Sequence, residues 1–320
     1  MKLSIVVAFY NEEKMIEKTH SEISKQLQEM LAQAGIDDYE LVYVNDGSRD
    51  KTLTLMRRIA DQDQRVRFIS FSRNFGREGA ILSGLKYATG DAVMLMDGDL
   101  QHPPALIPSF VTAFKEGYDV VSGQRDRKGE PKQSTFFARL FYRFANHLMD
   151  VQLTDGISEF KLFSRKAVDT ILALPEYNRF SKGIFSWIGF KEKIIPYQNQ
   201  VREAGESKFG FRRSMNYAFQ GIISFNDKPL RICIQFGLAC VGFALLYLLV
   251  MFIAYFVKPE ILVSGYFTTL AAIILFSGVQ LISIGVLGEY IGKIYYEVKR
   301  RPHYIVDETN IKKAKEDLVG

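Results

Sequence analysis

The stretch VMLMDGDLQHPP, residues 93–104, decides the fold of this chain. Its first four residues form an unbroken apolar run, which is typical of a strand buried on both faces of a parallel sheet. Asp97, Gly98 and Asp99 follow directly, at the carboxyl end of that strand. Open α/β sheets bind their ligands outside the carboxyl ends of their strands, so this stretch predicts a ligand site.

Asp97 and Asp99 have the chemistry of a site for a hard divalent cation. Two carboxylates separated by one glycine can share the ion, and the Gln101 amide adds a neutral oxygen. Mg²⁺ or Mn²⁺ prefers such an oxygen-only set and keeps positions open for phosphate oxygens. An isolated D-x-D pattern is also compatible with an ordinary Asp-Gly turn, but the neighbouring segments favour the metal site.

The first hundred residues alternate between strands and helices. Apolar runs predict strands at residues 3–9, 39–44 and 66–71, ahead of the strand at 93–96. Helices of ten or more residues are predicted between them, the first from about residue 12 to 34. This alternation predicts a doubly wound, mostly parallel α/β sheet.

Polar residues follow three of these strands, and parallel strands bring them to one edge of the sheet. These residues are Tyr10, Asn11 and Glu12, then Asp46, then Asp97 and Asp99. The chain has no G-x-G-x-x-G after its first strand and no G-x-x-x-x-G-K-[ST], so a glycine loop is not expected to hold phosphates. A metal on Asp97 and Asp99 would do so, which points to a nucleoside diphosphate leaving group.

Two long apolar segments follow the α/β part. Residues 232–257 and 261–288 carry no charged side chain, and at ~1.5 Å per residue each can cross a ~30 Å hydrocarbon core. Arg231 precedes the first segment, and Lys299, Arg300 and Arg301 follow the second. The positive-inside rule then places both termini and the catalytic domain in the cytoplasm. The alternative is a buried helical pair in a soluble core.

These features divide the chain into four parts. We expect a catalytic domain at 1–206, an amphipathic juxtamembrane segment at 207–230, two membrane helices within 231–290, and a cytoplasmic tail at 291–320. The juxtamembrane segment mixes basic and aromatic residues, which suits the lipid headgroup layer, although a solvated surface helix would look similar. The net charge of +5 is mild and gives no argument for a nucleic-acid partner. The start, MKLSIVVAFY, reads as a first strand and not as a signal peptide.

Several segments together resemble one known family. They are VVAFYNEE, VNDGSRD, SRNFGRE, MDGDLQHPP, SEFKLFSR, FSKGIFSWIG, AGESKF, PLRI and GVQLISIGVLGEYIG. The chain resembles family 2 glycosyltransferases of the GT-A fold, in particular the polyprenyl-phosphate sugar transferases. Within these it is most similar to the bactoprenol glucosyltransferases of phage-type serotype-conversion clusters.

The resemblance implies an activity and its partners. It implies transfer of glucose from UDP-glucose to undecaprenyl or another polyprenyl phosphate, with Mg²⁺ or Mn²⁺, at the bacterial inner membrane. It also implies a homo-oligomer, a tetramer, that works with a separate flippase and a second glycosyltransferase. A processive polysaccharide synthase would share the nucleotide-sugar domain, and an inactive membrane scaffold is the third reading. The synthase would normally carry Q-x-x-R-W, whereas the one tryptophan here, Trp187, lies in FSWIGF.

The resemblance also assigns roles to individual residues. Those matching the nucleotide-sugar site are Ala8, Tyr10, Glu12, Asp46 and Asp97, and those matching the metal site are Asp97, Asp99 and Gln101. Arg125 and Arg139 match arginines that hold phosphate groups of the donor or the lipid, and Arg202 and Lys208 are further candidates.

Two residues, Glu159 and Asp155, are candidates for the acid that faces the acceptor. Together with Asp99 they are the predicted catalytic residues. Close relatives carry Asp in a G-D-F-R-L pattern where this chain has Glu159, and Asp155 matches an acid of the dolichyl-phosphate sugar transferases. Glu159 could instead form a salt bridge with Lys161 or Lys166. Because a lipid phosphate is largely ionised near neutral pH, we expect an inverting displacement that needs little help from a base.

Overall fold

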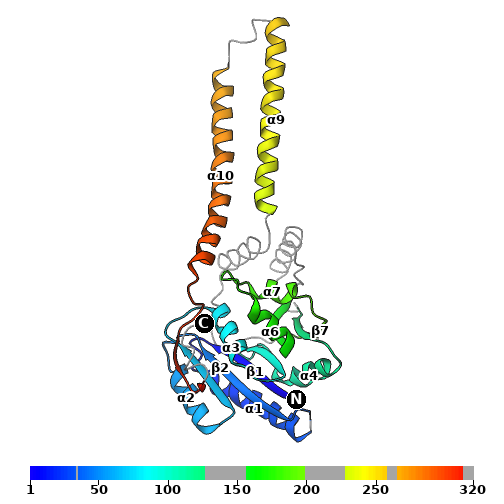
Figure 1. Cartoon of the computed structure of the whole chain (residues 1–320), viewed down its shortest axis with the longest axis vertical. Helices are drawn as coiled ribbons and strands as arrows, with labels where there is room; N and C mark the ends of the chain where they lie inside the picture. Colours follow the sequence, from blue (N-terminus) through cyan, green and yellow to red (C-terminus); the bar gives the residue numbers. More distant parts are fainter. Residues whose placement is uncertain (34, 127–155, 199–227, 258–264, 313–320) are drawn as a thin grey trace.

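A computed structural model describes residues 1–33, 35–126, 156–198, 228–257 and 265–312 of the chain. The described part forms an α/β domain built on one eight-stranded sheet, from which two long helices project (Figure 1). The strands lie in the order β7-β5-β6-β4-β1-β2-β3-β8. Their bounds are β1 Lys2–Phe9, β2 Asp38–Asn45, β3 Val66–Phe71, β4 Ala92–Asp97, β5 Val120–Arg125, β6 Ile157–Ser164, β7 Glu192–Tyr197 and β8 Val306–Thr309.

Helices cover both faces of this sheet. Side chains of α1, α2 and α4 pack against one face, and those of α3, α6 and α7 pack against the other. The helices are α1 Ile16–Ala32, α2 Thr52–Gln62, α3 Arg77–Tyr87, the short 3-10 turn η1 Pro104–Leu106, α4 Ile107–Lys115, α6 Arg165–Ala173, α7 Ser181–Trp187, α9 Lys228–Val257 and α10 Tyr266–Lys299.

The predicted architecture is confirmed. β4, β1, β2 and β3 are mutually parallel neighbours, while β6 and β8 run antiparallel to the strands beside them. β4 is buried on both faces: Val93 and Leu95 belong to one core and Met94 and Met96 to the other. The first helix begins at Ile16 rather than near residue 12, because residues 10–15 form a loop on the neighbouring strand ends.

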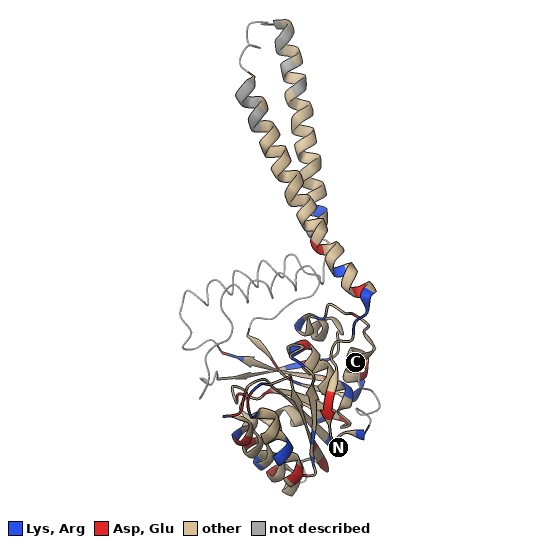
Figure 2. Cartoon of the chain, turned by 90° about the vertical axis from the view of Figure 1, so that its left-hand side faces the viewer, with Lys and Arg blue, Asp and Glu red and all other residues tan. Residues whose placement is uncertain are grey.

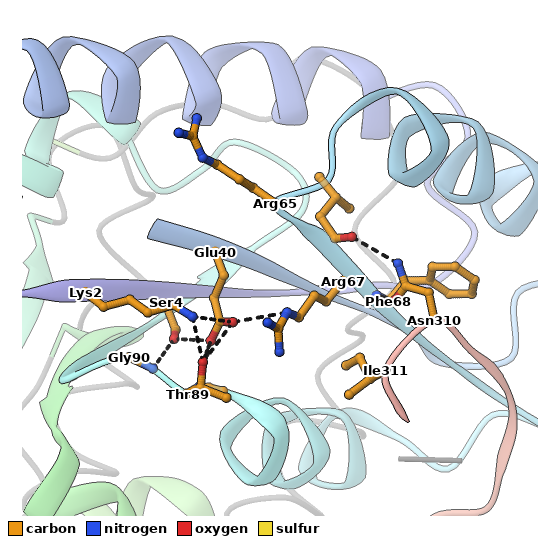
Figure 3. A network of polar contacts seen from close by, with 12 residues as sticks. Lys2, Ser4, Glu40, Arg65, Arg67, Phe68, Thr89, Gly90, Asn310 and Ile311 are labelled. Carbon is orange, nitrogen blue, oxygen red and sulfur yellow. Dashed lines mark hydrogen bonds and ion pairs between the residues drawn. The ribbon is translucent and has the colours of Figure 1, made fainter. Parts of the chain in front are cut away.

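The chain after the second long helix returns to the catalytic sheet, which the sequence did not predict. β8 adds an antiparallel edge strand to β3. Tyr304, just before it, is fully buried and stacks on Phe71 with ring centroids 5.0 Å apart. Arg57 Nε donates to Glu308 Oε1 at 2.8 Å. Asn310 Oδ1 accepts from the Phe68 amide at 2.8 Å (Figure 3).

Buried polar contacts close the amino-terminal edge of the sheet, opposite the predicted site. Glu40, at 2% exposure, accepts hydrogen bonds from Ser4 Oγ and the Thr89 amide, both at 2.6 Å (Figure 3). Lys2 Nζ and Arg67 Nε lie 3.2 and 3.3 Å from Glu40 Oε2. Burial alone would raise the pKa of Glu40, but these hydrogen bonds and the Arg67 charge hold it below its usual value.

α9 and α10 run side by side away from the domain (Figure 1). Both are long and apolar enough to cross a membrane, with a mean hydropathy of 1.8 in their most apolar windows. Their charged residues gather at the ends nearest the catalytic domain (Figure 2). The predicted turn at residues 258–260, the first residues of the second predicted span (261–264) and most of the predicted juxtamembrane segment (207–227) lie outside the described residues.

Candidate active site

The carboxyl ends of β4, β1 and β2 meet at one edge of the sheet, as the sequence predicted. In the sheet register, Ala8 of β1 pairs with Asp97 of β4 on one side and with Val44 of β2 on the other. The segments that leave these strands therefore begin side by side. We call this edge the carboxyl rim; it carries Tyr10, Asn11, Glu12, Asp46, Asp97 and Asp99.

The loops after β1 and β2 hold each other in place. The Asn11 amide donates to Ser48 Oγ at 3.0 Å, and the Arg49 amide donates to Asn11 Oδ1 at 2.9 Å. Asn11 has φ +54°, a left-handed conformation that asparagine adopts more readily than most residues. The Glu12 amide donates to Thr52 Oγ1 at 3.0 Å, which fixes the backbone of the segment predicted to face the nucleoside.

Asp46 binds the loop that leads into α3. Its carboxylate accepts hydrogen bonds from the Phe75 amide at 2.7 Å, from Asn74 Nδ2 at 2.9 Å and from the Gly76 amide at 3.0 Å. Burial raises the pKa of Asp46 to about 6, although the two amides oppose the shift. The residue therefore shapes the rim beside the predicted nucleoside position, and its contact with a nucleoside stays a prediction.

The turn after β4 is held in a single shape. A side chain at Gly98 would meet the Phe9 ring at 2.5 Å, and Thr19 Oγ1 donates to the Gly98 carbonyl at 2.9 Å. Asp99 Oδ1 accepts from the Gln101 amide at 3.1 Å across Leu100, which has φ +56°. As a result Asp97 lies partly open at the rim, with 30% of its side chain exposed, whereas Asp99 is 8% exposed.

Arg77 bridges two acids at the rim. Its Nη2 atom lies 2.7 and 2.9 Å from the two carboxylate oxygens of Asp97, and its Nε forms an ion pair with Glu159 Oε2. Glu159 is 5% exposed, so its charge is compensated mainly inside the protein. A small pocket opens at this point, lined by Ala8, Asp97, Arg77 and Glu159 together with apolar side chains.

Glu159 does not form the alternative salt bridge that the sequence suggested. Its partner is Arg77, whereas Lys161 Nζ lies 3.0 Å from Glu192 Oε1 and Lys166 lies over the Phe190 ring. The reason is the sheet order: β6 lies beside β4, so Glu159 reaches the rim of the sheet, where α3 begins.

His102 lies against both the backbone amide and the carboxylate of Asp97. Its ring stacks on Phe160 with centroids 4.9 Å apart, and its Nδ1 accepts from the Asp97 amide at 3.2 Å. Nε2 lies 3.7 Å from Asp97 Oδ2. Burial lowers the pKa of His102, so the neutral ring with a proton on Nε2 fits these contacts.

A second charged cluster lies behind the bridge. Glu78 accepts hydrogen bonds from the amide and the hydroxyl of Ser181, at the start of α7. Burial, followed by the charge of Glu159, raises the pKa of Glu78 to about 7. Burial lowers the pKa of Lys182, and the charge of Glu159 opposes that shift. The charge of Glu159 therefore acts on both Glu78 and Lys182.

Arg125 is the last residue of β5 and is exposed. Its amide donates to the Gly156 carbonyl at 3.0 Å. The charge of Arg125 acts on the pKa of Lys182 and on that of Tyr197, and the charges of Asp97 and Asp99 also act on the pKa of Tyr197. This places Arg125 on the same side of the domain as the rim acids. The other predicted phosphate and acceptor residues lie outside the described residues; they are Arg139, Asp155, Arg202 and Lys208.

The rim residues fit a hard divalent cation. Within the described residues no group of three or more His, Cys, Asp or Glu side chains is arranged to hold a metal, and the predicted set contains only two carboxylates and an amide. Asp97 nevertheless already binds a cationic group, the guanidinium of Arg77, through both oxygens. Carboxylate and amide oxygens are the ligands that Mg²⁺ and Mn²⁺ prefer.

Four residues of this site were given no role by the sequence: Arg77, Glu78, His102 and Lys182. All four lie inside the segments SRNFGRE, MDGDLQHPP and FSKGIFSWIG that carry the family resemblance. Their location in these segments was the sign in the sequence that they could belong to the site. The sequence could not show which residues they contact, because those residues come from strands and helices far away in the chain.

Two family models match the chain. Residues 4–172 match "Glycosyl transferase family 2", and residues 228–294 match "GtrB C-terminal hairpin". The putative glycosyltransferase CsbB of Bacillus subtilis is 45% identical over 312 residues, which cover 97% of this chain and 92% of that protein. The SfII prophage-derived bactoprenol glucosyl transferase of Shigella flexneri is 39% identical over 313 residues, covering 97% and 99%.

Among solved structures, the mannosyltransferase PcManGT of Pyrobaculum calidifontis, in complex with GDP-Man and Mn²⁺, is 17% identical with a TM-score of 0.48. The likeness covers 69% of this chain and 61% of that one. The relatives match nearly the whole chain, and the two family matches cover the sheet and the paired apolar helices. The chain belongs to glycosyl transferase family 2 and carries a C-terminal hairpin of the GtrB type.

Proposed function

We propose that this glycosyltransferase transfers glucose from UDP-glucose to undecaprenyl phosphate or another polyprenyl phosphate. The observation that carries the proposal is the bridge Asp97–Arg77–Glu159 at the rim, in a domain that is joined to a pair of apolar helices. Arg77 would offer a positive charge to the phosphates, Asp97 would offer a carboxylate to a metal ion, and the helices would keep the site near a lipid. The name of the Shigella relative supports glucose and a bactoprenol acceptor.

The chemistry of the acceptor explains the composition of the site. A phosphate monoester has a second pKa of ~6, so its oxygen is already a nucleophile near neutral pH. The greater difficulty is to bring two anions together, which calls for fixed positive charge in place of a strong base. Arg77, Lys182 and Arg125 supply such charge around the acids of the rim.

The proposed step is one in-line displacement. An oxygen of the lipid phosphate forms a bond to the anomeric carbon of the sugar while the bond from that carbon to UDP breaks. The electron pair leaves with UDP, and the anomeric configuration inverts. No proton has to be removed from the acceptor, so Glu159 would orient the sugar or the acceptor through Arg77 rather than act as a base.

The donor would lie along the carboxyl rim. The loops that carry Ala8, Tyr10, Glu12 and Asp46 would hold the nucleoside, and Asp97 would lie next to the diphosphate. Asp97, Asp99 and Gln101 would hold Mg²⁺ or Mn²⁺, which when bound offsets the negative charge on the leaving diphosphate. Arg77 would then exchange its contact with Asp97 for the donor phosphates while keeping Glu159.

The lipid phosphate would approach from the side of Arg125. The further candidates Arg139, Arg202 and Lys208 remain part of the proposal, as does Asp155 as the alternative acceptor-facing acid. We propose that the domain at 1–206 and both termini are cytoplasmic, because basic residues gather at the domain ends of α9 and α10 (Figure 2). A homotetramer and a separate flippase and second glycosyltransferase complete this proposal.

The proposal is tested by identifying the product. Membranes containing the chain are incubated with labelled UDP-glucose and undecaprenyl phosphate and are then extracted with organic solvent. Label in the organic phase, released as glucose by mild acid, supports the proposal. Label in an insoluble polymer indicates a polysaccharide synthase, and label that stays on UDP indicates an inactive scaffold; either result contradicts it. Other labelled UDP-sugars run in parallel identify the preferred donor.

A further inference from the structure

The loop between α6 and α7 contacts the end of the second hairpin helix. We call residues 174–180 the docking loop. Glu297 of α10 accepts hydrogen bonds from the Tyr177 amide at 2.9 Å and from the Asn178 amide at 3.0 Å. Asn178 Nδ2 also donates to Glu297 at 3.2 Å and to the Lys293 carbonyl at 3.1 Å. Glu297 is therefore a charged acceptor for successive backbone amides.

Aromatic rings strengthen the same contact. The Tyr177 ring lies nearly parallel to the Tyr296 ring, with centroids 6.0 Å apart and 7° between the planes. It also stacks on His303, which follows α10, at 5.2 Å. The docking loop is thus held by the last turns of α10 and by the segment leading to β8. Stacked rings of this kind fix the orientation of the docking loop.

The other end of the docking loop is fixed to the catalytic site. Arg179 donates to the carbonyls of Leu174 and Ile171, at 2.9 and 3.1 Å, which ties the loop to the end of α6. Ser181 follows at once and donates through its amide and hydroxyl to Glu78. Glu78 is adjacent in the chain to Arg77, the residue that bridges Asp97 and Glu159.

A second attachment joins α10 to the domain close to this point. Arg300, with φ +44°, ends the helix, and β8 joins the catalytic sheet only a few residues later. In that short connection the His303 carbonyl lies against α3: a side chain on Gly79 would meet it at 3.1 Å. α10 is therefore held on the domain at two places, the docking loop and β8.

We propose that Glu297 is a positioning residue, which sets the orientation of the catalytic rim relative to the hairpin helices through the amides of Tyr177 and Asn178. This inference rests on the proposed function, in which the acceptor phosphate is delivered at the membrane surface. An acceptor anchored in a bilayer can reach the rim only if the domain is held at the matching height and tilt. A small soluble acceptor has no such requirement.

The test compares two acceptors in Glu297→Ala and Glu297→Gln. We expect kcat/KM for undecaprenyl phosphate in vesicles to fall about tenfold or more in the alanine variant, the effect of losing a charge-assisted hydrogen bond. The glutamine variant, which keeps an acceptor oxygen, should lose less. For a short-chain, water-soluble prenyl phosphate both variants should match the unmodified chain.

Glu289→Ala is the matched control. Glu289 lies on α10 two turns earlier and, among the described residues, makes no hydrogen bond to the catalytic domain. This variant should behave as the unmodified chain with both acceptors. Hydrogen exchange adds a readout that is independent of activity: the peptide spanning the docking loop should exchange faster in Glu297→Ala and unchanged in Glu289→Ala.

Equal losses for the two acceptors, or no loss for either, would overturn the positioning role. Unchanged exchange in the docking loop would overturn the contact itself. If the unmodified chain transfers sugar to neither acceptor, the proposed function fails, and the lipid-dependent part of this inference fails with it. The exchange result separates these cases because it needs no turnover.

Discussion

Arg77 Nη2 lies 2.7 Å from Oδ1 and 2.9 Å from Oδ2 of Asp97. The guanidinium of Arg77 thus contacts the carboxylate that the sequence predicts to bind a metal ion. Arg77 also pairs with the buried Glu159. One guanidinium thus compensates both acids, and the metal ion that we propose would compete with it for Asp97. In the proposed function, metal binding would therefore depend on the position of Arg77.

We therefore expect Arg77→Ala to tighten Mn²⁺ binding in the absence of nucleotide. Because both partners are partly exposed, the competing ion pair is worth at most ~1 kcal/mol, and the dissociation constant should fall about two- to fivefold. Titration followed by electron paramagnetic resonance measures this. Arg58→Ala, which removes an exposed ion pair with Glu17 elsewhere, should leave Mn²⁺ binding unchanged. Weaker binding in Arg77→Ala would show that Arg77 does not compete for Asp97.

Glu78 should make the protein less stable as the pH rises. Its pKa is about 7 in the folded state against 4.5 ordinarily, so between these values the folded chain retains a proton that the unfolded chain has lost. Stability falls with pH where the folded state binds more protons. Relative to Glu78→Gln, the melting temperature of the unmodified chain should drop between about pH 4.5 and 7 and then run parallel. Parallel curves throughout would contradict the assignment, and Glu22→Gln, on the exposed face of α1, is the control.

Glu40 should show the opposite dependence. Hydrogen bonds and the Arg67 charge hold its folded pKa below the ordinary 4.5, so its contribution is complete above that pH and is lost as the pH falls through the folded value. Glu40→Gln should cost about 1–3 kcal/mol at neutral pH, because buried donors lose a charged acceptor. The difference from the unmodified chain should vanish at low pH. A difference that persists unchanged in acid would contradict this account.

Arg125 should act on the lipid phosphate and leave nucleotide binding largely unaffected. If its guanidinium holds that phosphate, Arg125→Ala loses contacts worth ~1.5–3 kcal/mol, and transfer slows about ten- to a hundredfold. Arg125→Lys should recover little, because lysine keeps the charge but loses the two-pronged geometry. The checks are initial rates against lipid concentration and a separate UDP titration. Normal lipid dependence in both variants would place the acceptor phosphate elsewhere.

The sequence could predict the elements whose signal is local. The apolar run at 93–96 followed by acids determines both a buried strand and a turn at its end, and β4 and Gly98 follow that expectation. β8 could not be found in this way. It is a short strand with two acidic residues that follows a long apolar helix, and its place comes from pairing with β3, far earlier in the chain.

The bridge Asp97–Arg77–Glu159 could not be predicted either, because it too depends on contacts between distant parts of the chain. Arg77, Asp97 and Glu159 come from three separate segments, and only the placement of β6 beside β4 and of α3 over the sheet brings them together. Sequence spacing suggested Lys161 and Lys166 as partners of Glu159 because they are near in the chain. Along a strand, however, neighbours on one face point in the same direction and need not meet.

The central claim is that the chain forms a bond between a sugar and a lipid phosphate at the Asp97–Asp99 turn. The most direct measurement is phosphorus NMR of undecaprenyl phosphate incubated with UDP-glucose, Mg²⁺ and the purified chain. The account predicts that the monoester signal is replaced by a diester signal as UDP appears, and that Asp99→Ala, still folded, gives no conversion while Asp38→Ala, exposed at the start of β2, converts normally. A lipid signal that stays monoester while UDP is released, or full conversion by Asp99→Ala, would contradict it.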